Sequence, residues 1–293
     1  MMRKWKIGDV TVTKIVESEL SHGLEFLIAP ATPEAVLPLK WLQPHFITPE
    51  GALIMSFHAL IIETPTRRIM VDTCVGNDKP RPVVPFFDRM RLPFLDMMTL
   101  AGFPPESIDT VVCTHLHIDH VGWNTMLVDG KWVPTFTKAR YLMGRTEFEH
   151  WKHEAEHCEP GDSHGELNRL VFGDSIQPVF DAGLVDLVAS DHRICNEVRL
   201  IPTPGHTPGH VSIHIASKGE AAMITGDMAH HPCQLAHPDW AASFDSDQAQ
   251  STRTREEVFA ARADDGILVI GTHWAGATAG RIIRDGAAYR LVV

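Results

Sequence analysis

The sequence predicts an α/β protein built from two sheets, with helices between the strands. Three observations support this fold class. Short strand-like runs dominate the chain and alternate with helical patterns. Hydrophobic residues make up 44% of the chain and charged residues 22%, as in an ordinary globular core. No internal repeat, low-complexity tract or linker-like shift in composition interrupts the chain, so we expect one domain over residues 1–293.

The first half of the chain contains alternating strand patterns and one continuous apolar run. The predicted strands cover residues 6–16, 53–63, 68–72, 108–114 and 140–143. The second and third form a hairpin around Thr64-Pro65, and the fourth is typical of a fully buried strand. Helical spacing of apolar residues predicts helices over residues 87–101 and 145–158.

The second half repeats this pattern. The predicted strands cover residues 198–202, 211–216, 221–225, 267–271 and a final hairpin over 281–293. Ser217-Lys218-Gly219 is the predicted turn between the second and third of these strands, and Asp285-Gly286 is the turn of the last hairpin. A polar-faced helix is predicted over residues 252–263. We expect the functional residues on the loops that follow the strands.

Charge and hydropathy exclude several classes of partner. The chain has 26 Lys and Arg against 37 Asp and Glu, a net charge of −11. An acidic chain lacks the broad positive surface that nucleic acid or an anionic membrane requires, so we expect neither as a partner. No apolar run approaches the roughly 18 residues of a transmembrane helix. The N-terminus has no apolar core of a signal peptide, and we expect a cytoplasmic protein.

Cysteine and histidine usage point in different directions. The five cysteines are scattered and form no CxxC pair, so neither a disulfide framework nor a cysteine-based zinc knuckle is expected. Eighteen histidines, in contrast, are well above ordinary usage. The clustering of these histidines carries the functional prediction.

Two segments are rich in Pro, Phe, Leu and Met and have weak periodicity. They cover about residues 20–50 and 80–99 and include Phe26, Trp41, Phe46, Phe86, Phe87 and Phe94. Such segments form either surface-packed loops or an apolar rim that caps a site. The N-terminal segment could equally serve the interface of a homodimer.

The strongest motif is His115-Leu116-His117-Ile118-Asp119-His120, directly after the predicted buried strand 108–114. In an extended segment His115 and His117 project to the same side and can chelate one ion. Asp119 and His120 can hold a second ion after the chain turns. Imidazole and carboxylate ligands suit zinc or a similar divalent ion.

Six residues cannot complete two coordination shells, so distant partners are required. Three loops after strands supply residues of the ligand type: His206 within Pro204-Gly205-His206-Thr207-Pro208-Gly209-His210, Asp227 after Thr225-Gly226, and His273 after Gly271-Thr272. Each alone is explained more simply as a turn histidine or a helix-capping aspartate. Four such placements at strand ends make that simple explanation a poor one.

This set of motifs, in this order, resembles the metallo-β-lactamase superfamily across most of the chain. The resemblance implies an αββα sandwich with a dinuclear metal site. The first ion would be held by His115, His117 and His206, and the second by Asp119, His120 and His273, with Asp227 bridging the two. It also implies that Asp72 supports the metal loops from outside. Zinc is the expected metal, with manganese, cobalt and iron as alternatives.

The resemblance further implies a hydrolase that uses a bridging hydroxide. The stretch Asp227-Met228-Ala229-His230-His231-Pro232 is most similar to the group that contains N-acyl homoserine lactonases and methyl parathion hydrolase. We expect cleavage of a lactone or ester in a small molecule with an apolar portion. The alternatives are an organophosphate triester or aryl ester, a glyoxalase II-like thioester and, in another class, an iron-dependent oxygenase on the same scaffold.

Three residues are candidates for a catalytic role beyond binding metal. Asp119 or Asp227 would take the proton of the nucleophile. One set of lactonases places a tyrosine three residues after the bridging aspartate, and this chain has His230 there. His230 could hydrogen-bond the leaving oxygen, although an ordinary buried or surface histidine is the simpler interpretation.

A second motif suggests a different enzyme class. His153-Glu154-Ala155-Glu156-His157 matches the HExxH pattern of zinc proteases. At about 100° per residue, however, the apolar face of this helix contains Phe148 and Trp151, and both motif histidines lie on the opposite side. We therefore expect His153 and His157 to be solvated and to take no part in catalysis.

Overall fold

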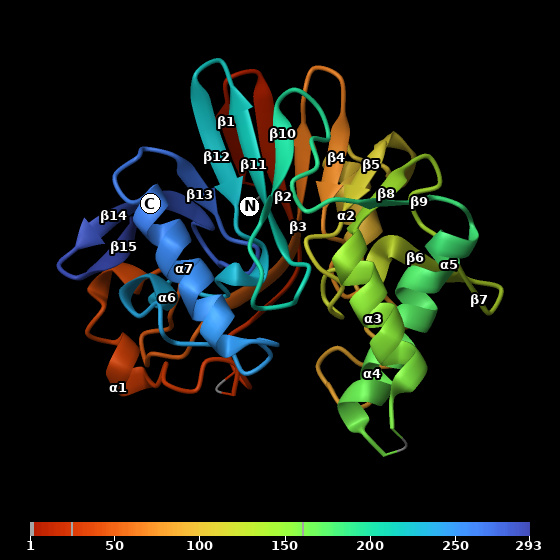
Figure 1. The fold of residues 1–293 in the computed structure, drawn as a ribbon, viewed down its shortest axis with the longest axis horizontal. Helices are drawn as coiled ribbons and strands as arrows, with labels where there is room; N and C mark the ends of the chain where they lie inside the picture. Colours follow the sequence, from red (N-terminus) through yellow and green to blue (C-terminus); the bar gives the residue numbers. More distant parts are fainter. Residues whose placement is uncertain (1–2, 25, 160) are drawn as a thin grey trace. The chain divides into compact units, whose positions relative to one another are not determined.

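The computed structural model describes residues 3–24, 26–159 and 161–293. Contacts between Cα atoms divide the chain into two compact units, each assembled from two stretches of sequence. The first unit comprises residues 1–17 and 57–189, and the second comprises residues 18–56 and 190–293. Figure 1 gives the element labels used below.

The first unit is built on a mixed seven-stranded sheet with the order β1-β2-β3-β4-β5-β8-β9. Its strands are β1 (Lys4–Ile7), β2 (Val10–Leu20), β3 (Met55–Glu63), β4 (Arg68–Val71), β5 (Thr110–Val112), β8 (Arg140–Gly144) and β9 (Val185–Val188). Strands β4, β5, β8 and β9 run parallel, and β1-β2 and β3-β4 are antiparallel hairpins. Parallel strands carry their following loops at one edge, which places the loop after β5 beside the loop after β4.

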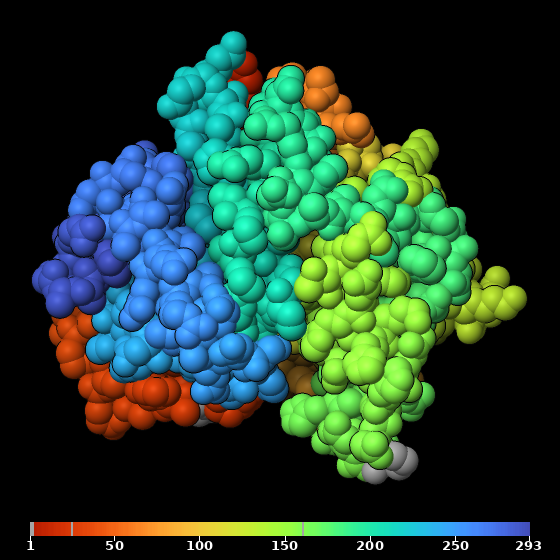
Figure 2. Space-filling view, viewed as in Figure 1, coloured from red at the N-terminus to blue at the C-terminus, as the bar shows by residue number. Residues whose placement is uncertain are grey.

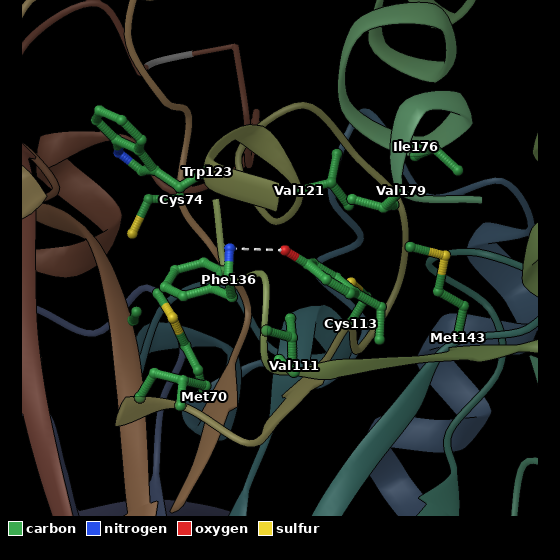
Figure 3. Packing of buried hydrophobic residues seen from close by; sticks show 14 of the residues in the cluster. Met70, Cys74, Val111, Cys113, Val121, Trp123, Phe136, Met143, Ile176 and Val179 are labelled. Carbon is green, nitrogen blue, oxygen red and sulfur yellow. Dashed lines mark hydrogen bonds between the residues drawn. The ribbon is translucent and has the colours of Figure 1, made fainter. Parts of the chain in front are cut away.

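Helices of the first unit pack on the sheet. They are α2 (Phe94–Leu100), η2 (Pro105–Ser107), η3 (Gly122–Asn124), α3 (Arg145–His157), α4 (Ser163–Val171), the π-helix η4 (Phe172–Ile176) and α5 (Gln177–Asp181). A small hairpin is formed by β6 (Thr125–Val128) and β7 (Lys131–Pro134). Met98 from α2 and Phe148 and Trp151 from α3 join Val111 and Tyr141 from the strands in one buried cluster, part of which is shown in Figure 3.

The second unit contains a six-stranded sheet with the order β10-β11-β12-β13-β14-β15. Its elements are α1 (Pro33–Val36), η1 (Lys40–Leu42), β10 (Val198–Pro202), β11 (Val211–Ser217), β12 (Glu220–Ile224), η5 (Gly226–Met228), α6 (Cys233–Ala236), α7 (Gln248–Arg262), β13 (Leu268–Ile270), β14 (Ala279–Asp285) and β15 (Ala288–Val292). Because β10-β11 and β11-β12 are antiparallel and β12-β13 is parallel, β10, β12 and β13 all run in the same direction. The loops that follow these three strands therefore meet at one edge.

The two stretches of the second unit are joined by specific contacts. His231 Nε2 lies 2.7 Å from the carbonyl oxygen of Phe46, and the amide of Ser243 donates to the carbonyl of Leu27 at 2.8 Å. Figure 2 shows this red to orange segment against the blue C-terminal part of the chain. The apolar segment of residues 20–50 is thus anchored to the unit that contains His206, Asp227 and His273.

The fold class is confirmed: both units consist of mixed sheets accompanied by helices. Two element predictions were wrong in detail. Residues 6–16 form parts of two strands, because Gly8 adopts a φ of 56° and allows a turn between β1 and β2. The helix expected over residues 87–101 begins only at Phe94, after Pro93, whose missing N–H and fixed φ suit a helix start.

No disulfide bond links cysteines of the described residues. All five cysteines are free thiols, three of them buried. No helix in the described ranges is long and apolar enough to cross a membrane.

Candidate metal centre

The loop of residues 114–120 follows β5 in the first unit and is anchored by Asp72, which follows β4. Asp72 Oδ1 accepts the backbone N–H of Thr114 at 2.8 Å, and Oδ2 accepts the Thr114 hydroxyl at 2.9 Å. Asp72 Oδ2 also lies 2.9 Å from Nδ1 of His120. Asp72 itself has a φ of 55°, which is uncommon outside glycine and turns its carboxylate toward the loop.

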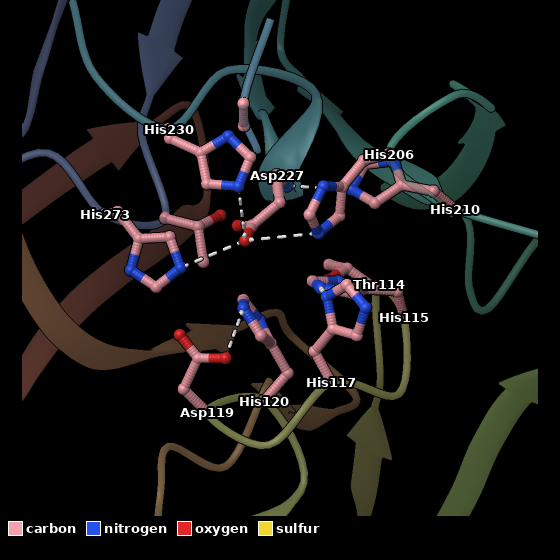
Figure 4. Close-up of polar contacts among 12 residues, drawn as sticks. Thr114, His115, His117, Asp119, His120, His206, His210, Asp227, His230 and His273 are labelled. Carbon is pink, nitrogen blue, oxygen red and sulfur yellow. Dashed lines mark hydrogen bonds and ion pairs between the residues drawn. The ribbon is translucent and has the colours of Figure 1, made fainter. Parts of the chain in front are cut away.

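The four predicted ligands of the first unit are brought together. His115 Nε2 lies 3.1 Å from His117 Nδ1, and His120 Nε2 lies 3.6 Å from Asp119 Oδ1. The rings of His115 and His120 are 4.0 Å apart between centroids. His115 and His120 are buried, whereas Asp119 keeps 14% of its side-chain surface exposed. Figure 4 shows Asp119 and His120 facing each other.

Helix α3 braces the same loop from its first turn. Glu147 Oε1 accepts the backbone N–H of Leu116 at 3.1 Å and the indole N–H of Trp151 at 2.5 Å. The Trp151 ring in turn lies 5.0 Å from the His117 ring in an edge contact. Sequence analysis missed Glu147, because a glutamate in the first turn of a helix has an ordinary role in capping and helix-dipole compensation.

In the second unit, the loops after β10, β12 and β13 carry the predicted ligands to one edge. His206, Asp227 and His273 are all buried. Asp227 Oδ2 is faced by three imidazoles: Nε2 of His273 at 3.1 Å, Nε2 of His230 at 3.3 Å and Nε2 of His206 at 3.7 Å. Figure 4 shows these three rings directed at the same carboxylate. We call His206, Asp227, His230 and His273 the Asp227 cluster.

The outer nitrogens of two rings in the Asp227 cluster are held by acceptors. His206 Nδ1 lies 2.9 Å from Asp245 Oδ1, and His273 Nδ1 lies 3.3 Å from the carbonyl oxygen of Ser56. Burial lowers the pKa of His206 even though the Asp245 carboxylate opposes that shift. Neutral imidazoles with a fixed outer nitrogen are what metal coordination requires, because the inner nitrogen is then free of its proton.

A further histidine, His210, sets the position of Asp227. Its Nε2 accepts the backbone N–H of Asp227 at 2.8 Å, and its Nδ1 lies 2.9 Å from the carbonyl oxygen of Thr203. Gly226 makes this approach possible, since a Cβ there would lie 2.4 Å from His210 Nε2 and the residue has a φ of +55°. His210 therefore supports the cluster through the backbone. Its place in the same motif as His206 was the only signal in the sequence.

His230 differs from the other rings of the Asp227 cluster. Its side chain is 4% exposed, yet its Nδ1 has no hydrogen-bond partner within the described ranges. Its backbone is fixed by Gln234, whose Oε1 accepts the N–H of His230 at 2.8 Å. Because no acceptor in the described part of the chain fixes its outer nitrogen, His230 fits a proton donor or hydrogen-bonding group better than a metal ligand.

The donor sets of both units fit divalent metal ions. Each unit supplies imidazole nitrogens and a carboxylate, the ligands of zinc and neighbouring transition metals. In each, a buried carboxylate holds the outer nitrogen of one histidine: Asp72 for His120 and Asp245 for His206. Such carboxylate–histidine pairs are typical of metal sites. Asp245 was missed in the sequence, where it lies in a polar loop without a motif.

The HExxH motif lies where the helical pattern predicted. His153 and His157 lie on the solvent-facing side of α3, with rings 4.2 Å apart, while Phe148 and Trp151 are buried on the opposite face. The aromatic residues of the segments 20–50 and 80–99 differ in exposure. Phe94 is fully buried in the core cluster against Trp123, whereas Phe26 and Phe86 are exposed.

The fold and the donor sets together define a class. A family model described as the metallo-beta-lactamase superfamily matches residues 58–273. The chain belongs to the metallo-β-lactamase superfamily.

One sequence relative and two solved structures are similar to this chain over most of its length. An N-acyl homoserine lactonase of Bacillus sp. is 24% identical over 225 residues, which cover 71% of this chain and 78% of the relative. Among solved structures, hydrolase AbOPH of the beta lactamase superfamily has a TM-score of 0.80 at 22% identity, covering 99% of this chain and 96% of its own. AidC, a dizinc quorum-quenching lactonase, has a TM-score of 0.75 at 18% identity over the same shares. At these identities the two structures establish a shared fold.

Proposed function

We propose that this protein is a dinuclear-metal hydrolase that opens a lactone or cleaves a small ester, in the manner of an N-acyl homoserine lactonase. The observation that carries the proposal is the Asp227 cluster, in which one carboxylate oxygen is faced by three imidazole nitrogens. The Bacillus lactonase relative and the lactonase structure AidC support the reaction class.

The proposed ligand set follows the order of the family's motifs. One ion would be bound by His115, His117 and His206 and the other by Asp119, His120 and His273, with Asp227 bridging. When bound, two divalent cations supply Lewis acidity and a hydroxide nucleophile at neutral pH. We propose zinc, because imidazole-rich donor sets with a few carboxylates suit it, with manganese, cobalt and iron as the alternatives.

The protein's own groups would manage the protons. Asp119, which keeps 14% of its side chain exposed, or Asp227 would take the proton of the nucleophile. His230 would donate a hydrogen bond or a proton to the leaving oxygen. Its Nε2 lies 3.3 Å from Asp227, which places this group beside the proposed bridging carboxylate.

The substrate would carry an apolar portion. Phe26, from the segment of residues 20–50, is 47% exposed and makes an edge contact at 5.7 Å with Phe244, which is 44% exposed. Phe244 directly precedes Asp245, the partner of His206. Exposed aromatic rings, one of them adjoining the hydrogen-bond partner of a proposed ligand, support recognition of an acyl chain or aryl group.

A second candidate is hydrolysis of an aryl ester or an organophosphate triester. His230 favours it, because the chain has this histidine where one set of lactonases has a tyrosine. A substrate with a good leaving group makes less demand on a proton donor than an aliphatic lactone does.

A homodimer and a cytoplasmic location also belong to the proposal. Light scattering and cell fractionation test them.

A substrate panel tests the proposed function. Purified protein would be stripped with a chelator and reloaded separately with zinc, manganese, cobalt or iron. Each form would be assayed on N-acyl homoserine lactones, aryl acetates, a phosphotriester and a thioester. We expect metal-dependent opening of lactones. Turnover of the thioester alone would indicate a thioesterase, oxygen uptake by the iron form an oxygenase, and no turnover in any arm would contradict hydrolysis.

A further inference from the structure

A buried ion pair between Asp245 and Arg255 lies next to Nδ1 of His206, the ring nitrogen that faces away from Asp227. Asp245 Oδ1 lies 2.9 Å from His206 Nδ1, and Asp245 Oδ2 accepts the backbone N–H of Ala242 at 3.0 Å. Arg255 Nη1 lies 3.4 Å from Asp245 Oδ2. The side chains of both Asp245 and Arg255 are fully buried. Burying a carboxylate and a guanidinium costs free energy unless each charged group is paired and hydrogen-bonded.

The two oxygens of Asp245 have different partners, and this difference fixes a tautomer. Oδ2 faces two donors, the N–H of Ala242 and the guanidinium of Arg255. Oδ1 faces the His206 ring. Since an ionised carboxylate accepts and never donates, His206 Nδ1 must carry the proton. His206 Nε2 then carries a lone pair, and it is this atom that lies 3.7 Å from Asp227 Oδ2.

We propose that Asp245, held by Arg255, is a positioning residue that fixes His206 in its Nδ1–H tautomer and so makes Nε2 available to bind metal. The inference rests on the proposed function in one respect, namely that His206 is a metal ligand. It adds residues that lie on α7 and on the loop before it, outside every motif of the sequence.

The loop that carries His206 does not depend on this carboxylate for its backbone position. The N–H of Ser246 donates to the carbonyl of His206, and the N–H of Asp247 donates to the carbonyl of Gly205, both at 2.9 Å. A Cβ at Gly205 would lie 2.3 Å from the backbone nitrogen of Ser251, so the loop and α7 are in close contact. The carboxylate of Asp245 can therefore be altered while these backbone contacts remain.

The substitution Asp245→Asn distinguishes a role of Asp245 in fixing the His206 tautomer from a role in packing. An asparagine has nearly the same shape, but one of its two terminal groups is a donor. That NH₂ group is excluded from the Oδ2 position, where two donors already point. It must face His206 Nδ1 instead, which forces the proton onto Nε2 and removes the lone pair needed by the metal.

The proposal predicts an order of metal affinity that packing alone would not give. Zinc binding, measured by calorimetry and by metal content after dialysis, should weaken by about 10–100-fold in Asp245→Asn. Asp245→Ala, which removes the acceptor of His206 without putting a donor in its place, should weaken zinc binding less, and Asp245→Glu, which keeps a carboxylate, should retain most of the affinity. A packing role predicts the reverse for the first two, with the near-isosteric asparagine closest to wild type.

The tautomer can also be read without metal. In the metal-free protein, the ring ¹⁵N shifts of His206 should report Nδ1–H in the wild type and Nε2–H in Asp245→Asn. Asp247→Asn is the matched control: it makes the same charge change two residues away on an exposed α7 cap that asparagine also serves. It should leave both the shifts and zinc binding unchanged.

The outcomes are distinguishable. If the wild type binds no divalent metal, the proposed function fails. If the wild type binds metal and Asp245→Asn keeps the Nδ1–H tautomer or wild-type affinity, the positioning role is wrong. Should Asp245→Asn not fold, Asp245→Ala serves in its place. A mixture of His206 tautomers in that variant supports the role, and unchanged Nδ1–H overturns it.

Discussion

The histidines of this protein differ mainly in what holds the second nitrogen of each ring. His120 is held by Asp72 and His206 by Asp245, both buried carboxylates. His157 is held by the carbonyl of His153, one turn earlier on an exposed helix face. A buried ring with a carboxylate behind it has its tautomer and orientation fixed before any metal arrives. The exposed His157 ring has a backbone carbonyl as its partner and stays open to solvent.

This contrast predicts the effect of removing single histidines. His117→Ala should lower kcat/KM by more than about 100-fold, because loss of a ligand exceeds the 10–100-fold effect typical of groups behind the ligands. His157→Ala should stay within about twofold of wild type, because its ring is exposed and lies on the face of α3 opposite Trp151. Steady-state kinetics with the reloaded enzyme measures both.

An equal loss of activity in His157→Ala and His117→Ala would contradict the assignment of the centre. It would instead favour the HExxH helix as the catalytic element.

At the scale of elements, strand direction brings the proposed ligands of the second unit together. β10, β12 and β13 run the same way, so His206, Asp227 and His273 follow strands at one edge although they are far apart in sequence. The strand ends were predictable, because each proposed ligand follows an apolar run. The pairing order that makes the three strands neighbours depends on long-range contacts and could not be read from local patterns.

The supporting residues were less accessible to sequence analysis than the ligands. Glu147, His210 and Asp245 act through hydrogen bonds to backbone or ring atoms that only the tertiary structure brings near. None has a spacing that sets it apart from an ordinary helix, turn or loop residue. The motifs of the proposed ligands could be recognised in the sequence because metal coordination restricts which residue types can serve. A residue that only hydrogen-bonds to a proposed ligand or to its backbone can be of many more types.

The turn at Gly226 gives a test at this scale. Gly226→Ala should disrupt the contact between His210 and the Asp227 backbone, because the new Cβ would lie 2.4 Å from His210 Nε2. We expect a loss of about 1–3 kcal/mol in the free energy of unfolding, from overpacking and the positive φ together, and weaker zinc binding. Urea denaturation and calorimetry measure the two effects.

Gly219→Ala is the control for this substitution. Gly219 has a φ of +81° in the hairpin turn between β11 and β12, and a Cβ added there would meet nothing within 4 Å among the described residues. It should show the cost of backbone strain alone and leave zinc binding intact. Equal zinc affinities in both variants would contradict the role given to His210.

At the scale of the whole molecule, a buried acid makes stability depend on pH. Glu17 accepts the backbone N–H groups of Val75 and Gly76 and the indole N–H of Trp123. Burial outweighs these hydrogen bonds and raises the pKa of Glu17 from 4.5 to about 7. The folded protein therefore holds this proton over a pH range in which the unfolded chain has released it.

The sign of the effect follows from linkage. Between about pH 4.5 and 7 the native state binds more protons at Glu17 than the unfolded state does, so the free energy of unfolding falls as the pH rises, by up to about 3 kcal/mol, and levels off above pH 7. Glutamine does not titrate. The unfolding free energy of the wild type should therefore fall relative to that of Glu17→Gln across this window, as measured by urea denaturation at pH 5, 6, 7 and 8. Parallel curves for the two proteins would show that Glu17 is ionised throughout.

The contact between Trp151 and His117 has a practical consequence. An indole whose ring centroid lies 5.0 Å from that of a proposed ligand is a natural fluorophore beside the proposed metal position. Its emission is sensitive to the charge and the electronic structure of whatever its neighbour binds. Occupancy in the first unit can thus be followed in the unlabelled protein, by a signal that requires neither substrate nor turnover.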